Sequence, residues 1–280
     1  MKPNISLIIL THNEELNLEK CLKSVEGLVS EIIIVDSNST DKTKEIAEKF
    51  GARFVVHEFK NQADQFNWAL DNVQINGDWV MRMDADEELL PELKSEIAEK
   101  LESLNKEVCG VVLKRRVYFM GRWIKHGGYY PTCLMRIFRK DTGMSENREM
   151  DEHLILKTGK EVVFENDFID DNRKDLTFWI AKHNGYASRE ARATLEKQKD
   201  SLAGSFSGSQ AEKKRWLKEK IYNNFPLFVR PFFYYIYRYI FRLGFLDGKE
   251  GFIFHFLQAF WYRFLVDSKI YELRRKNGKG

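Results

Sequence analysis

The first 90 residues alternate short apolar runs with helical patterns, and this alternation limits the possible folds more than any other feature of the chain. The runs at 5–10 and 32–35 are rich in β-branched residues and have the length of strands that are buried on both faces. A helical pattern follows the first run, with Asn13 as a cap and with Leu18 and Leu22 at helical spacing. This order predicts an α/β fold in which helices cover both faces of a mostly parallel sheet.

Polar clusters follow three of the expected strands. The stretch THNEE follows the first strand, DSNSTD follows the second, and DADE follows the fourth. Ligands of such sheets bind beyond the carboxyl ends of the strands. A single cluster would be interpreted as a solvated loop with capping residues, which is the commonest role of these residue types at element ends. Three clusters at one edge favour a binding site instead.

Asp84 and Asp86 are separated by one residue, and in an extended segment this spacing turns both carboxylates toward the same side. Two carboxylates on one side repel each other unless a cation lies beside them. Oxygen ligands select a hard ion, Mg²⁺ or Mn²⁺, which usually completes its coordination shell with phosphate oxygens. The pattern therefore predicts a site for a divalent metal and a phosphate-bearing ligand.

The stretches SLIILTHNEE, EIIIVDSNSTDKT and DWVMRMDADE resemble, in their order and spacing, the inverting family 2 glycosyltransferases of the GT-A fold, which are nucleotide-sugar enzymes of bacterial envelopes. The resemblance covers the first third of the chain. It implies a GT-A type nucleotide-binding sheet and a nucleotide-sugar donor. The C-terminal half is similar to the branch that builds lipopolysaccharide cores and surface polysaccharides, which implies a lipid-linked glycan or lipopolysaccharide-core acceptor.

The resemblance also implies roles for individual residues. The nucleotide pocket is lined by Thr11, Asn13 and Glu14. Asp36 bonds the base, Asp84 approaches the ribose and the metal, and Asp86 binds the metal that bridges the diphosphate. The leaving group is a nucleoside diphosphate whose charge grows as the glycosidic bond breaks, and the metal neutralises that charge.

A general base is expected in the stretch ENREMDEHLIL. The family carries an acidic pair after the acceptor loop, with the Asp as base, whereas this chain has Asp151, Glu152 and His153 in place of the common Glu-Asp pair. We expect Asp151 to deprotonate the acceptor hydroxyl, with Glu152 as the alternative. His153 is interpreted as a third metal ligand, a phosphate contact or a surface histidine.

Two further stretches are candidates for contacts with the acceptor or the diphosphate. In HGGYYP, two glycines permit close backbone approach, and aromatic side chains there could stack on or bond a sugar, although an ordinary tight turn also explains the pattern. The start of a predicted helix in WIAKHNGYASREA could contact the diphosphate or could be solvated. The candidate residues in these stretches are His126, Tyr129, Tyr130, Lys182, His183 and Tyr186.

The formal net charge of +3 combines two regions of opposite sign. From Ala211 onward the chain has 15 Lys or Arg and 6 acids, a net charge of +9, and the remainder has 30 and 36, a net charge of −6. This shift predicts a catalytic domain at 1–210 and a basic, aromatic-rich helical region at 211–280. Nucleic-acid binding is disfavoured because the basic residues are mixed with bulky apolar ones and no nucleic-acid motif occurs.

The C-terminal region has the pattern of amphipathic helices that lie in a membrane interface. Its longest charge-free run, at 251–262, is too short to span a bilayer. Multiples of four separate Arg230, Arg238 and Arg242, which predicts that they share one helical face toward anionic headgroups, with the aromatics elsewhere. The alternative is a helical hairpin that packs on the catalytic domain or on a second subunit, with the aromatics as its core.

These observations predict a metal-dependent inverting glycosyltransferase that takes a UDP-sugar and acts at the inner face of the plasma membrane. Cys21, Cys109 and Cys133 are far apart and odd in number, which fits a reducing cytosol better than a disulfide framework or a zinc site. A sugar-nucleotide nucleotidyltransferase would need a Gly-rich phosphate loop after the first strand, where this chain has THNEE. A non-catalytic membrane adaptor would not need acids at three strand ends.

Overall fold

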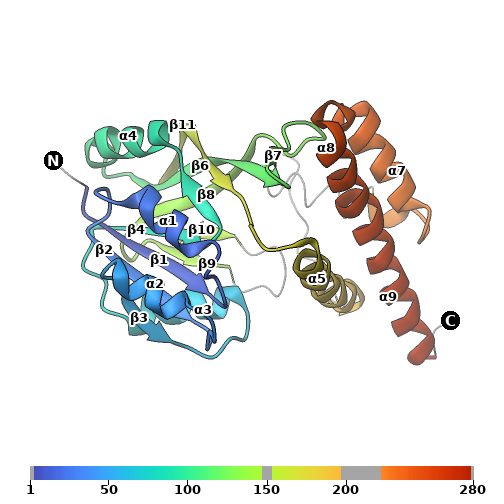
Figure 1. The fold of residues 1–280 in the computed structure, drawn as a ribbon, viewed down its shortest axis with the longest axis horizontal. Helices are drawn as coiled ribbons and strands as arrows, with labels where there is room; N and C mark the ends of the chain where they lie inside the picture. Colours follow the sequence, from blue (N-terminus) through green and yellow to red (C-terminus); the bar gives the residue numbers. More distant parts are fainter. Residues whose placement is uncertain (1–2, 147–152, 197–221, 279–280) are drawn as a thin grey trace. The chain divides into compact units, whose positions relative to one another are not determined.

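The computed structural model describes residues 3–146, 153–196 and 222–278. The chain forms two compact units: unit 1 comprises Met1–Gly121 and Tyr130–Arg173, and unit 2 comprises Arg122–Tyr129 and Lys174–Gly280. Unit 1 is built around a β-sheet and unit 2 mainly from helices (Figure 1). The predicted boundary between residues 210 and 211 lies outside the described residues.

The sheet of unit 1 has the strand order β3-β2-β1-β4-β8-β6-β11-β5 (Figure 1). Its strands are β1 Ile5–Thr11, β2 Glu31–Asp36, β3 Arg53–Val56, β4 Trp79–Asp84, β5 Glu87–Leu89, β6 Val108–Phe119, β8 Thr132–Arg139 and β11 Lys160–Asp170. The first four strands in this order are parallel, as are β6 and β11, whereas β8 and β5 are antiparallel to their neighbours. The predicted α/β fold with a mostly parallel sheet is confirmed.

Helices cover both faces of this sheet. They are α1 Leu18–Val25, α2 Thr43–Lys49, α3 Gln62–Asn72 and α4 Pro91–Lys100, which continues into the 3₁₀ turn η1 Leu101–Ser103. Alternate residues of β1 point to opposite faces, so Leu7 belongs to the same core cluster as Leu22 of α1, whereas Ile8 belongs to the cluster of Phe66 from α3. Each of these side chains is fully buried, and burial of such a side chain stabilises a fold by roughly 1.5–3 kcal/mol. The central strands are therefore held firmly from both sides.

Three short strands lie outside this order. β9 (Gly143–Ser145) and β10 (Leu154–Leu156) form a separate antiparallel pair in unit 1. β7 (Arg122–Trp123) belongs to the residues of unit 2.

Unit 2 confirms the predicted helical C-terminal region. Its elements are α5 Leu176–Glu196, η2 Tyr222–Asn224, α7 Arg230–Ile236, η3 Tyr237–Phe241, η4 Gly244–Asp247, α8 Gly248–His255, η5 Phe256–Trp261 and α9 Tyr262–Lys276. α8, η5 and α9 follow one another without a break, and α7 packs beside them (Figure 1). None of the helices in the described part of the chain has the length and apolar content needed to cross a bilayer.

Two of the three arginines, Arg230 of α7 and Arg238 of η3, differ from their predicted arrangement on one face toward headgroups. Arg230 is only 5% exposed and forms an ion pair with the fully buried Asp267 of α9. The Arg238 guanidinium lies 3.9 Å from the ring centroid of Tyr129. A buried carboxylate needs a partner, and an aromatic face attracts a cation, so these two arginines are used inside unit 2. Of the three, Arg242 is exposed as predicted.

Candidate active site

The ends of β1 and β2 are joined through a buried carboxylate. Thr11 pairs with Asp36 in the sheet register, and its hydroxyl donates a hydrogen bond of 2.7 Å to Asp36 Oδ2. Asp36 also accepts hydrogen bonds from the backbone N–H of Ser39 at 2.7 Å and from its hydroxyl at 2.5 Å. Because Asp36 is 1% exposed, these donors compensate the cost of burying the side chain and hold it at the edge of the sheet.

The loops after β1 and β2 are tied together by hydrogen bonds. The Asn13 N–H donates to Ser39 Oγ at 2.7 Å, and Asn13 Oδ1 accepts from the Thr40 N–H at 2.8 Å. Asn13 has a φ of 54°, a left-handed conformation that Asn tolerates better than most residues. The Glu14 N–H donates to Thr43 Oγ1 at 2.8 Å. The structure thus brings Thr11, Asn13, Glu14 and Asp36 together at one edge, as the polar clusters predict.

A cavity of about 480 Å³ opens beside Asp36. It is lined by Asp36, Asn38, Ser39, Lys44, Glu48, Ala52, Phe54 and Val56. The loop after β2 supplies polar groups, and β3 supplies the ring of Phe54 and the side chain of Val56. Pockets for small molecules span roughly 300–1,000 Å³ and combine apolar walls with a few placed polar groups.

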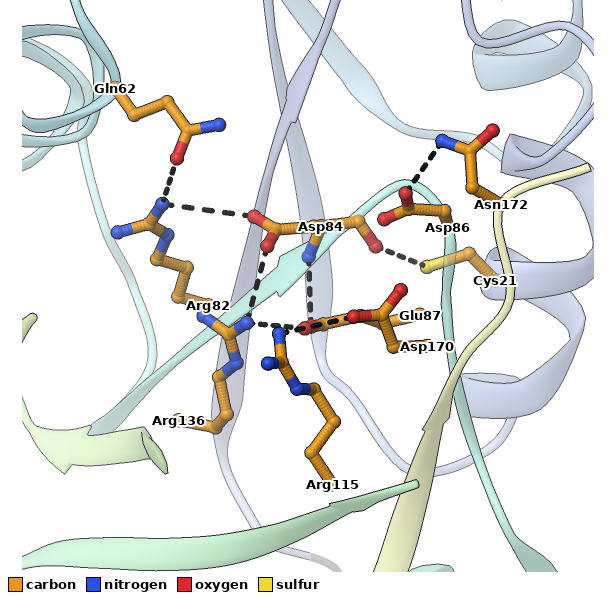
Figure 2. Close-up of polar contacts among 10 residues, drawn as sticks. All are labelled: Cys21, Gln62, Arg82, Asp84, Asp86, Glu87, Arg115, Arg136, Asp170 and Asn172. Carbon is orange, nitrogen blue, oxygen red and sulfur yellow. Dashed lines mark hydrogen bonds and ion pairs between the residues drawn. The ribbon is translucent and has the colours of Figure 1, made fainter. Parts of the chain in front are cut away.

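Asp84 ends β4, and Asp86 lies in the turn that leads into β5. The intervening Ala85 is buried, and residues 85–86 form a turn rather than the extended segment on which the prediction of one shared side depends. The two carboxylates have different partners (Figure 2). Asp86 Oδ2 accepts a hydrogen bond of 2.8 Å from Asn172 Nδ2, whereas Asp84 Oδ2 lies 3.2 Å from Arg136 Nη2.

Arg82, Arg136 and Glu87 surround Asp84, and of these only Glu87 belongs to a polar cluster that the sequence analysis identified (Figure 2). Arg136 of β8 also forms an ion pair with Glu87, and Glu87 Oε2 accepts a 3.0 Å hydrogen bond from the Asp84 N–H. Arg82 Nη2 lies 3.7 Å from Asp84 Oδ1 and donates to Gln62 at 3.3 Å. Burial raises the pKa of Glu87 to about 8, against the opposing attraction of Arg136. A fixed frame of cations and hydrogen bonds thus orients Asp84.

A signal for this frame is present in the sequence. Arg82 and Arg136 interrupt the apolar strands WVMRMD and TCLMRIFR, and both are less than 8% exposed. A cation inside a buried strand requires a carboxylate or a comparable partner nearby. The pattern indicates that each arginine has an acidic or comparable partner. It does not identify that partner, because Arg136 lies 52 residues from Asp84 along the chain.

The candidate metal ligands do not form a complete cage. Among the described residues, no three His, Cys, Asp or Glu side chains are grouped so that they could hold a metal ion. His153 precedes β10, where its carbonyl accepts a 2.8 Å hydrogen bond from the Glu146 N–H, and the structure does not gather it with Asp84 and Asp86. Mg²⁺ is usually bound by one or two carboxylates together with substrate phosphates and water. The donor set of Asp84 and Asp86 fits an ion that arrives with a diphosphate.

The two candidate bases, Asp151 and Glu152, lie outside the described residues. Their assignment therefore stays a prediction.

The HGGYYP stretch is engaged in local contacts. His126 Nδ1 lies 2.6 Å from Asp247 Oδ1, and a Cβ added to Gly127 would lie 2.0 Å from His255 Cε1. Burial raises the pKa of Tyr129 to about 12. In unit 1, the Tyr130 hydroxyl donates to the Asp167 carboxylate at 3.0 Å. These contacts favour the turn interpretation for the stretch, and a role of its residues in sugar binding stays a prediction.

The candidates of the WIAKHNGYASREA stretch lie on α5. His183 Nδ1 lies 2.8 Å from the Trp179 carbonyl oxygen, and the two rings stack with centroids 3.5 Å apart. Burial lowers the pKa of His183 to about 4, so its imidazole is neutral at neutral pH. Lys182 Nζ lies 5.9 Å from the ring centroid of Tyr186. Of these three residues, Lys182 is the one that carries a positive charge at neutral pH.

Comparison with known proteins identifies relatives over nearly the whole chain. A family model described as glycosyl transferase family 2 matches residues 6–177. An uncharacterized glycosyltransferase of Rickettsia typhi is 30% identical over 277 residues, which are 98% of this chain and 88% of the relative. The lipopolysaccharide core biosynthesis glycosyltransferase LpsC of Rhizobium meliloti is 28% identical over 287 residues, with 96% of this chain and 92% of the relative covered.

A solved structure shares the fold. The mannosyltransferase PcManGT from Pyrobaculum calidifontis, in complex with GDP-Man and Mn²⁺, matches 97% of this chain and 88% of its own chain, with a TM-score of 0.53 and 13% identity. At this identity the likeness concerns the fold alone, and it agrees with the predicted GT-A type architecture.

Proposed function

The chain belongs to glycosyl transferase family 2 and is a glycosyltransferase, and we propose that it transfers a sugar from a UDP-sugar, with inversion, to a lipid-linked glycan or a lipopolysaccharide-core acceptor. The observation that carries the proposal is the meeting of three polar strand ends at one sheet edge, where Thr11 ends β1 and where Asp36 and Asp84 end the parallel strands β2 and β4 on either side of it. The relation to LpsC, which is described as a lipopolysaccharide core biosynthesis enzyme, supports the acceptor class.

The donor nucleotide would occupy the edge formed by β1, β2 and β3. In this proposal Asp36 accepts a hydrogen bond from the base, and the base occupies the cavity beside Phe54. Thr11 keeps the Asp36 carboxylate in place through its 2.7 Å hydrogen bond. Asn13 and Glu14 shape the pocket through the ties between the two loops. A preorganised acceptor of this kind loses little entropy when the donor binds.

Asp86 would hold Mg²⁺ or Mn²⁺ together with the diphosphate, Asp84 would bond the ribose and approach the metal, and His153 stays a candidate third ligand. When bound, the metal supplies positive charge to the leaving nucleoside diphosphate. The chain's own contribution is to keep Asp84 oriented, because Arg136 and Glu87 fix its carboxylate and its backbone N–H. The structural neighbour PcManGT was solved with Mn²⁺ and GDP-Man, which supports a divalent metal as the proposed cofactor but assigns no residue of this chain to it.

For the transfer itself, Asp151 is the proposed base, with Glu152 as the alternative. The base takes the proton of the acceptor hydroxyl while its oxygen attacks the anomeric carbon from the face opposite the leaving group. Contacts with the acceptor or the diphosphate are the roles proposed for His126, Tyr129, Lys182, His183 and Tyr186. Because its pKa is lowered to about 4, His183 would act in such a contact as a neutral hydrogen-bonding group.

The membrane is the proposed place of action. A lipid-linked acceptor lies at a bilayer, and the region at 211–280 has a net charge of +9 that favours the anionic inner face of the plasma membrane. We therefore propose a peripheral enzyme on the cytoplasmic side.

Calorimetric titration with a panel of UDP- and GDP-sugars, with Mn²⁺ or with a chelator, tests the donor site. Mn²⁺-dependent binding of one donor should disappear in Asp86→Asn. The matched control is Asp141→Asn, the same chemical change at an exposed position with a φ of 67° that Asn also tolerates. If no nucleotide sugar binds, or if both variants behave alike, the proposed donor site is wrong. Analysis of the product formed with a binding donor then separates sugar transfer from nucleotidyl transfer.

A further inference from the structure

In unit 2, α7 and η3 form the first arm of a helical hairpin, and α8, η5 and α9 form the second arm. The first arm exposes an apolar surface. Six side chains of α7 and η3, which we call the aromatic face, are between 43% and 73% exposed. They are Phe232, Phe233, Ile236, Tyr237, Ile240 and Phe241. They fall into two rows at four-residue spacing, one through Phe232 and one through Phe233. An apolar surface of this extent on a folded protein marks a site for another protein or for a membrane.

The backbone of the hairpin keeps these two rows of side chains parallel to the helix axis. Four residues exceed the 3.6 residues of one α-helical turn, so a row at this spacing winds around an ordinary α-helix. The elements η3 and η5 are π-helical, and π turns, which are closed by i→i+5 bonds, hold more residues than α turns. Alternation of α and π turns therefore keeps residues four apart on one side of the helix. π turns are rare and are frequently found at functional sites, which agrees with a functional role for the aromatic face.

The second helix continues the aromatic face. Phe252 and Phe256 are exposed and stack at 6.5 Å. The ring of Phe260 lies 5.4 Å from Phe256 and 4.6 Å from Phe232, so it joins the rows of the two helices. The exposed rings thus form one surface that extends over both arms of the hairpin.

The other sides of the same helices are packed. Ala187 and Ala191 of α5 form a buried cluster with Val266 and Ile270 of α9. The ion pair between Arg230 and Asp267 joins α7 to α9 beneath the surface. The aromatic face is therefore the remaining side of an ordered bundle. Within unit 2 these six side chains are exposed, and the alternative prediction of a hairpin that packs on the catalytic domain or on a second subunit with the aromatics as its core stays a prediction.

The charges around the aromatic face are mostly positive. The turn of the hairpin carries exposed Arg242 and Lys249 close in sequence to the exposed Leu243 and Phe245, and the half-buried Glu250 is the acid beside Lys249. Asp247, an acid of the same turn, is 2% exposed and bonded to His126. A positive border complements anionic lipid headgroups. A two-fold dimer through this face would instead bring two such borders together, because both copies present the same patch.

We propose that the aromatic face docks into the interface of an anionic bilayer, with its rings placed among the headgroups and the upper acyl chains. This inference deepens the proposed membrane location and rests on the proposed lipid-linked acceptor. It assigns the attachment to exposed rings, because Arg230 and Arg238 are used inside unit 2. Burial of apolar area is insensitive to salt, so attachment should persist when surface charges are screened.

Vesicle flotation of the full chain tests the inference. The probes are vesicles of phosphatidylcholine alone and of phosphatidylcholine with phosphatidylglycerol at about 3:1, each at low and at high salt. The test variant is Phe233→Ser with Phe241→Ser, at positions that are 57% and 73% exposed. The matched control is Ile155→Ser with Val163→Ser, at positions of unit 1 that are 41% and 51% exposed. Thermal unfolding checks that both variants are folded.

We expect the wild type and the control to float with the anionic vesicles at both salt concentrations. Partitioning of the test variant should fall at least about tenfold, because each removed ring contributes apolar area. Equal flotation of the test variant, or attachment that high salt abolishes, would overturn the role of the rings. A wild type that does not float but forms a dimer that the test variant breaks would assign the face to a second copy.

The same preparations separate this inference from the proposed function. Donor binding is measured by titration without vesicles, and both double variants should bind the donor like the wild type. If the wild type floats through its aromatic face but binds no nucleotide sugar, the docking surface stands and the proposed donor site fails. If the donor binds and flotation is absent, the opposite conclusion follows.

Discussion

The site at the strand ends of unit 1, around Asp36 and Asp84, and the aromatic face of unit 2 differ in what they bury and what they expose. At the strand ends, the buried carboxylate of Asp36 accepts hydrogen bonds from Thr11 and Ser39. At the aromatic face, apolar rings are exposed, and Phe241 is 73% exposed. Buried charge is tolerated because it is compensated, whereas exposed rings gain stability only from a further partner. The comparison indicates that stability and attachment are carried by different regions.

The largest effect should follow from Arg136→Met. This change leaves Glu87, which is 2% exposed, without its guanidinium partner. Removal of one member of a buried ion pair costs about 3–5 kcal/mol, and because the pKa of Glu87 is already raised to about 8, uptake of a proton should keep the loss at or below that range. Chemical denaturation should show this loss in the free energy of unfolding. The double variant Arg136→Met with Glu87→Gln should recover part of it. A single variant as stable as the wild type would mean that the pair does not contribute to the frame around Asp84.

Acidification should weaken unit 2. Burial lowers the pKa of His255 from 6.5 to about 4, and the groups facing its ring include Asp247, Arg238 and His126. The unfolded chain binds a proton below pH 6.5 and the folded chain only near pH 4, so stability falls as the pH drops through this window. The loss is at most about 3 kcal/mol for this histidine.

The variant His255→Phe isolates this contribution. The ring fills the space beside Gly127 and Gly244, and its Nε2 lies 3.7 Å from Asp247 Oδ2, which is longer than a hydrogen bond. A phenyl ring should therefore fit and should flatten the fall of the melting temperature between pH 6.5 and pH 4. An unchanged pH profile would show that His255 is not responsible.

Thr11→Val tests the buried hydrogen bond of the strand-end site. The two side chains have nearly the same shape, but the variant lacks the Thr11 hydroxyl that donates a 2.7 Å hydrogen bond to Asp36. Hydrogen bonds to charged groups contribute about 1.5–3 kcal/mol, so the free energy of unfolding should fall by about 2 kcal/mol. The affinity for the nucleotide-sugar donor should fall as well. A stability loss with unchanged donor affinity would separate Thr11 from the nucleotide pocket.

The smallest effect on stability should follow from Phe241→Ser. Substitutions of exposed side chains usually change the free energy of unfolding by less than about 0.5 kcal/mol. A loss several times larger would mean that this ring packs within the protein, which would contradict its place on the aromatic face. Phe138→Ser provides the contrast, because Phe138 is fully buried and should behave as a core position.

Much of the fold follows from local sequence patterns, and part of the site does as well. The apolar runs predicted the strands from β1 to β4, and the polar clusters predicted which side chains meet at the sheet edge, because parallel strands place their carboxyl ends together. The position of β8 between β4 and β6 was not predictable in this way, since it depends on antiparallel pairing between segments far apart in the chain. That pairing brings Arg136 to Asp84.

The sequence alone determined the identity of the acids at the strand ends, the family resemblance and the aromatic, basic character of the C-terminal region. Only the tertiary structure decided which charges are used internally, because a buried arginine and an exposed arginine have the same local pattern. Arg230 and Arg242 illustrate the difference: one pairs with Asp267 in the interior, and the other lies on the surface. Spacing along a helix defines a face, but the contacts of that face with distant segments define its surroundings.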